Sequence, residues 1–135
     1  MLFIAVLSMA GCGKVTLSQN DDLHPLALKS KCREDGEKIR SEWKRTYFQD
    51  VFSDEPQYVY NRSLQTCFWL GEYTGPSIDR GSAGKLVPVQ THVQFILDVY
   101  TNKTLIEYTE HNGEQIGDVS KADFQRRKSQ LFDSP

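Results

Sequence analysis

The chain lacks an excess of charge of either sign. Its 135 residues carry 16 Lys and Arg against 18 Asp and Glu, for a net charge of −2 at pH 7. Because the two signs are interspersed, no strongly basic face is indicated and we expect no nucleic-acid partner. Hydrophobic residues make up 39% of the chain and aromatic residues 11%. This is enough for a packed core, so we expect a folded domain rather than a disordered chain.

Long apolar runs and familiar catalytic motifs are also missing. The strongly apolar start is shorter than the roughly 20 residues that a membrane-spanning helix needs. The patterns G-x-S-x-G, H-E-x-x-H and C-x-x-C do not occur. The glycine-rich stretch 81–85 does not fit a phosphate-binding loop, because Asp79 and Leu86 stand where that motif needs Gly and Ser or Thr. The sequence therefore indicates no common enzyme class, and we expect no cofactor.

The first twelve residues form an uncharged, mostly apolar segment that ends at Cys12. Its length fits the apolar part of a signal peptide, and Met9-Ala10-Gly11-Cys12 resembles the lipobox of bacterial lipoproteins. The resemblance implies that residues 1–11 are removed and that Cys12 carries two or three acyl chains, which form a stable membrane anchor. Gly13 in place of Asp implies the outer membrane of a Gram-negative host, facing the periplasm. The alternative is a buried strand or helix of a cytosolic protein.

The cysteine count agrees with export. With Cys12 assigned to lipid, only Cys32 and Cys67 are left, and in an oxidising compartment we expect such a pair to form a disulfide. This bond would stabilise the fold by about 4 kcal/mol in the chain-entropy description. Two unrelated buried thiols are the alternative. Residues 12–28 then form a lipidated cysteine with a flexible tether, and residues 29–135 form a single domain.

Two helices are predicted, over residues 30–53 and 120–131. In the first, apolar positions recur at spacings of three and four, Ser30 is placed to cap the start, and Pro56 lies beyond the end. In the second, Ser120 is the expected cap, with Val119 and Phe124 as a hydrophobic staple. The inner face of the first helix is expected to consist of Cys32, Gly36, Ile39, Trp43 and Tyr47, where glycine lets a sheet approach closely.

Between the helices, alternating apolar residues predict strands at 58–60, 64–73 and in a hairpin over 91–111. The alternation places Cys67 and Trp69 on the face toward the first helix. Residues 74–88, rich in glycine and proline, are expected to be a loop. The fold class expected is therefore α+β: one main N-terminal helix on an antiparallel sheet of about four strands. A short C-terminal helix is expected to dock at an edge.

Asp98 and Glu107 are the candidate catalytic residues. If the hairpin turns at Asn102 and Lys103, the two carboxylates oppose each other across neighbouring strands, about 5 Å apart. Such a pair fits the hydrolysis of glycans by a small periplasmic enzyme, or a cation site. The alternative is an ordinary solvated sheet face, so no catalytic residue is assigned.

The histidines do not complete a metal site. His92 and His111 are expected near the open end of the same hairpin, where Glu110 or Glu114 could add a third ligand, whereas His24 lies in the tether. Two histidines alone do not hold zinc, and we expect no metal.

These features together favour a membrane-anchored, non-enzymatic envelope lipoprotein that binds another protein or an envelope polymer. A hydrolase that uses Asp98 and Glu107 and a purely structural lipoprotein are the alternatives. The last helix is basic, which suits anionic lipid headgroups or an ordinary solvated face. Its cations are Lys121, Arg126, Arg127 and Lys128.

Overall fold

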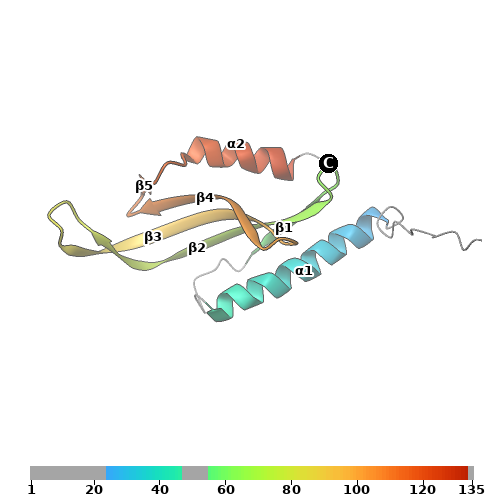
Figure 1. The fold of residues 1–135 in the computed structure, drawn as a ribbon, viewed down its shortest axis with the longest axis horizontal. Coiled ribbons are helices and arrows are strands. Elements are labelled where there is room, and N and C mark those ends of the chain that lie inside the picture. Colours follow the sequence, from blue (N-terminus) through green and yellow to red (C-terminus); the bar gives the residue numbers. More distant parts are fainter. Residues whose placement is uncertain (1–23, 47–54, 134–135) are drawn as a thin grey trace, which may run out of the picture.

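The computed structural model describes residues 24–46 and 55–133. These residues form a five-stranded antiparallel sheet with a helix on each face (Figure 1). Each strand pairs with its neighbours in sequence, in the order β1-β2-β3-β4-β5. The expected α+β class is confirmed, with five strands instead of about four. The elements are α1 (Pro25–Thr46), β1 (Gln57–Asn61), β2 (Thr66–Arg80), β3 (Leu86–Asp98), β4 (Lys103–His111), β5 (Glu114–Ile116) and α2 (Lys121–Phe132).

The helix α1 begins earlier than predicted. Pro25 is its first residue, a position where a missing N–H is not needed. His24 caps it, because its Nδ1 accepts a hydrogen bond from the Leu26 amide at 3.3 Å and its carbonyl accepts one from the Ala27 amide at 2.8 Å. The prediction of Ser30 as the cap is therefore wrong. The last residues of the expected tether, 25–28, belong to the helix.

The sheet face under α1 holds the first core cluster. Trp43 of α1 stacks on Phe95 of β3 with 5.1 Å between ring centroids, and it meets Trp69 of β2 edge-on at 5.7 Å. Cys67 and Trp69 thus face the helix, as their alternation predicted. The predicted inner face of α1 is confirmed except for Tyr47, which lies outside the described residues. The buried members of this cluster are Cys32, Cys67, Trp69, Val93, Phe95, Leu97 and Val99.

The helix α2 lies over the opposite face of the sheet (Figure 1), not at the predicted edge. The Ser120 hydroxyl accepts a hydrogen bond from the Asp123 amide at 3.0 Å, which confirms the predicted cap. Val119 and Phe124 pack into one cluster, as expected of a staple. The buried members of this second cluster are Phe68, Ile96, Tyr108, Phe124 and Leu131. Apolar side chains on both faces explain why a second layer is needed.

Residues 74–80 and 86–88 form strand where a loop over 74–88 was predicted. β2 and β3 stay paired out to Arg80 and Leu86, and a tight turn at 81–85 closes the hairpin with a Gly84 amide to Gly81 carbonyl hydrogen bond of 2.8 Å. Figure 1 shows this two-stranded arm, residues 75–91, reaching beyond the rest of the sheet. Pro76 and Pro88 lie in strands whose outer edges are open here, where a missing N–H is tolerated.

Candidate functional site

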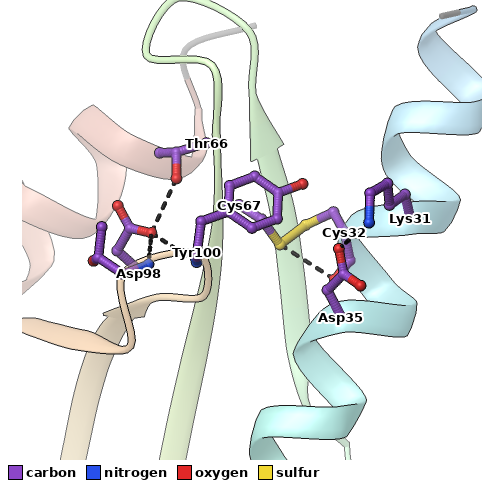
Figure 2. The surroundings of a disulfide bond; sticks show 8 residues. Lys31, Cys32, Asp35, Thr66, Cys67, Asp98 and Tyr100 are labelled. Atoms are coloured by element: carbon purple, nitrogen blue, oxygen red, sulfur yellow. Dashed lines mark hydrogen bonds and ion pairs between the residues drawn. A yellow bond between two sulfur atoms is a disulfide. The ribbon is translucent and has the colours of Figure 1, made fainter. Parts of the chain in front are cut away.

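The predicted disulfide is confirmed. Cys32 of α1 and Cys67 of β2 are bonded, with 2.03 Å between sulfur atoms and 5.4 Å between Cα atoms. Both residues are buried in the first core cluster. Figure 2 shows the bond joining helix to strand. The disulfide therefore fixes α1 on the sheet, whereas the predicted lipid site, Cys12, lies outside the described residues.

Asp98 organises the turn between β3 and β4. Its Oδ1 accepts hydrogen bonds from the amides of Tyr100 at 2.9 Å and Thr101 at 3.2 Å, and from the Thr66 hydroxyl at 3.0 Å. Figure 2 shows these contacts close to the disulfide. An aspartate that accepts backbone hydrogen bonds two and three residues ahead stabilises a turn. The geometry thus gives Asp98 a structural role.

The predicted opposition of Asp98 and Glu107 is wrong. Asp98 pairs with Lys103, and Glu107 pairs with Phe95. Paired residues point to the same face of a sheet. Glu107 therefore lies on the α1 face with Phe95, and Asp98 lies on the α2 face with its other partner, Phe68. The two carboxylates therefore lie on opposite faces of the sheet, and the geometry does not support them as a catalytic pair.

Two local features caused this error. The turn occupies residues 99–102, so it is centred on Tyr100 and Thr101 and not on Asn102 and Lys103. A bulge then shifts the register between Ile96 and Leu97. Asn102 does adopt the expected positive φ, 51°. Backbone preference identified the turn region correctly but could not fix the turn length or the bulge.

His92 lies within a polar row on the α2 face. Its Nε2 is 2.6 Å from Oε1 of Glu72, and its Nδ1 is 3.2 Å from Oε2 of Glu110. The Tyr108 hydroxyl donates to Oε1 of Glu110 at 2.6 Å. This hydrogen bond, and after it the one from His92, lowers the pKa of Glu110. The row spans β2, β3 and β4, so sequence reasoning without the register missed it.

The histidines do not gather ligands for a metal. His92 and His111 lie on neighbouring strands near the open end of the β3–β4 hairpin, as expected. His111, however, contacts Asp79 of the arm, with 3.3 Å between Nδ1 and Oδ2. Both ring nitrogens of His92 contact carboxylates. Within residues 24–46 and 55–133, no group of three His, Cys, Asp or Glu side chains could hold a metal ion.

A groove follows the outer edge of β1, and sequence reasoning missed it as well. It has a volume of about 690 Å³, and its lining includes Lys29 and Arg33 of α1, residues 57–60 of β1, and Phe132 of α2. A hollow between Arg40 and Trp69 measures only about 40 Å³, room for little more than a water molecule. By size and shape, the β1 groove is the better candidate for binding a partner.

The basic character of α2 is partly neutralised. Arg126 forms an ion pair with Asp123 of the same helix, with 2.5 Å between Nη2 and Oδ1. The positive charge of Lys121 helps to lower the pKa of Glu110 on β4. Neither described helix has the length and apolar character to span a bilayer.

Comparison with known protein families, with curated proteins and with solved structures finds no match for this chain.

Proposed function

We propose that this protein is a lipid-anchored, non-enzymatic protein of the bacterial cell envelope, that it is attached to the membrane through Cys12, and that its folded domain binds an envelope partner. The observation that carries the proposal is the buried Cys32–Cys67 disulfide. Disulfides persist in oxidising compartments and are rare in the cytosol. The lipobox-like Met9-Ala10-Gly11-Cys12 supports the same location.

The positions and contacts of the candidate catalytic residues, Asp98 and Glu107, support binding in preference to catalysis. The Asp98 carboxylate is occupied by the turn that follows it, and Glu107 lies on the other face of the sheet. The β1 groove offers an extended surface and is not a closed pocket. Hydrolysis of envelope polymers by the pure protein would contradict this part of the proposal.

Intact mass of the protein from its native membrane fraction, with and without reduction and alkylation, tests the anchor and the compartment together. We expect a species that begins at Cys12 with added acyl mass, in which two thiols become alkylated only after reduction. A Cys12→Ser variant serves as the control and should leave the membrane fraction. A full-length, unlipidated chain with three free thiols would overturn the proposal.

A further inference from the structure

The outer edge of β1 has no strand partner within the described residues. β1 pairs with β2 from Gln57↔Leu70 to Asn61↔Thr66, and it ends the sheet on this side. An edge strand presents unpaired backbone N–H and C=O groups at every second residue, which can pair with another extended chain. Figure 1 shows β1 lying between the two helices, with α1 and α2 in the layers to either side. Among the described residues the edge is therefore open along the strand and bounded on both faces.

The two walls of the β1 groove differ in chemistry. On the α1 side stand Lys29 and Arg33, both exposed, and neither takes part in an ion pair among the described residues. Their neighbours on α1 are different, since Lys31 and Lys38 pair with acidic residues of the helix itself. Two cations that face the same groove, with no ion-pair partner in the described part of the chain, favour an anionic occupant.

On the α2 side the groove is apolar. Val59 pairs with Phe68, so its side chain points to the α2 face. Phe132 lines the groove beside it and stacks on Phe68, with 6.4 Å between ring centroids. A strand added to β1 would place alternate side chains on the two faces. One set would lie beside Tyr58 and Tyr60 and meet Lys29 and Arg33, and the other set would meet Val59 and Phe132.

We propose that β1 binds an extended peptide of a partner protein as a sixth strand, and that the peptide alternates acidic residues, which meet Lys29 and Arg33, with apolar residues, which meet Val59 and Phe132. The mode is strand addition, in which backbone hydrogen bonds supply affinity and alternate side chains supply specificity. A second copy of β1 does not fit, because its sequence, QYVYN, contains no acidic residue. This inference names the partner class of the proposed function and rests on its binding part, not on the lipid anchor.

The test uses the full, oxidised chain in detergent and a fluorescent six-residue peptide of alternating Glu and Val. Fluorescence anisotropy measures affinity, and amide exchange measures protection of residues 57–61. We expect saturable binding and slower exchange in β1. Replacing every Glu of the peptide by Lys should weaken binding at least tenfold, and N-methylation of the peptide backbone should abolish it.

Charge reversal of the groove is the matched protein variant. Lys29→Glu combined with Arg33→Glu should weaken binding of the Glu-Val peptide at least tenfold. Arg80→Glu combined with Lys85→Glu makes the same change in net charge at the tip of the arm, far from β1 in the fold, and should bind as the wild type does. Val59→Thr should weaken binding several-fold while keeping a β-branched residue in the strand. Near-ultraviolet circular dichroism checks that each variant is folded.

Several results would overturn the inference. These are no binding of the peptide at millimolar concentration, equal binding of the Lys-Val peptide, and equal loss in both charge-reversed variants. A peptide-free dimer with protected β1 amides would assign the edge to a second copy instead. Lipidation is a separate question, because Cys12→Ser should bind the peptide normally. Failure of the mass experiment and failure of this one are therefore distinguishable.

Discussion

At the residue scale, close packing on the α1 side of the sheet depends on two glycines. A Cβ at Gly36 of α1 would overlap the ring of Tyr58, and a Cβ at Gly71 of β2 would overlap the ring of Phe95. Both residues are buried, and both lie on the side of the disulfide. The hydrogen atom of glycine thus makes room for an aromatic ring at each position.

Gly36→Ala should destabilise the fold even though alanine is the better helix former. Overpacking against Tyr58 destabilises the folded state by about 1–3 kcal/mol, whereas the higher helix propensity of alanine stabilises it by about 1 kcal/mol. We expect a net loss of about 1 kcal/mol in the free energy of unfolding, measured by urea titration. Ser41→Ala, at an exposed position of α1, is the matched control and should not destabilise. A stabilised Gly36→Ala variant would show that the contact with Tyr58 is not limiting.

Asp98→Ala should lower the free energy of unfolding by about 1–2 kcal/mol, because the Tyr100 and Thr101 amides and the Thr66 hydroxyl lose their acceptor. Asp98→Asn keeps a carbonyl acceptor and should lose less. Thermal unfolding of the two variants measures the difference. Equal losses would mean that the negative charge matters more than the hydrogen bonds.

The carboxyl of Glu110 makes part of the stability pH-dependent. The Tyr108 hydroxyl, and then His92, hold its pKa below the usual value of 4.5. Its ionised form therefore stabilises the fold above about pH 4.5, and this contribution is lost as the pH falls through the folded-state pKa. Wild type and Tyr108→Phe should differ most near neutral pH, and the difference should shrink as the pH falls through the lowered folded-state pKa of Glu110. Urea titrations across this range measure the difference, and a constant gap would contradict the assignment.

At the scale of elements, the sequence predicts whether a segment is helix or strand better than it predicts where that segment begins and ends. Apolar spacing identified α1 and its inner face, and a capping pattern identified α2. Alternation put Cys67 and Trp69 on the correct side of β2. The turn before β4 and the bulge that follows it depend on hydrogen bonds that alternation does not encode. The polar row around His92 and the β1 groove each need side chains from three elements, so neither could be predicted without the topology.

The arm was misread because glycine and proline usually mark loops. Here Gly75, Pro76 and Pro88 lie in a two-stranded ribbon that needs no outer hydrogen bonds. Ile78 and Leu86 near its tip are 68% and 69% exposed, and the buried residues of both core clusters lie outside residues 75–91. The arm is therefore held by its own pairing and adds little to the core.

Shortening the arm should leave the domain folded. We expect that replacing residues 77–89 by an Asn-Gly turn, which favours hairpins, preserves cooperative unfolding and keeps the midpoint temperature within about 4–8 °C, the equivalent of roughly 1 kcal/mol. Differential scanning calorimetry measures this. Loss of a cooperative transition would show that the arm takes part in the core.

At the scale of the whole molecule, the disulfide joins parts of the chain that are 35 residues apart. Cys32→Ala combined with Cys67→Ala should lower the free energy of unfolding by about 4 kcal/mol, a large share of the 5–15 kcal/mol typical of a domain. Cys12→Ser is the control and should unfold like the wild type in urea. An unchanged double variant would mean that packing around Trp43 and Trp69 alone holds α1 in place.

The simple strand order β1-β2-β3-β4-β5 separates pairing of the sheet from the covering of its second face. Because each strand pairs with its neighbours in sequence, strand pairing requires no segment that lies beyond β5. Only α2, the last element, covers the second apolar face, and Asn61 at the end of β1 donates to the Leu131 carbonyl at 3.0 Å. A chain truncated before α2 would keep its sheet yet expose Phe68, Ile96 and Tyr108 to proteases. The helix α2 thus protects the second apolar face, and its loss is expected to raise sensitivity to proteolysis more than it disturbs strand pairing.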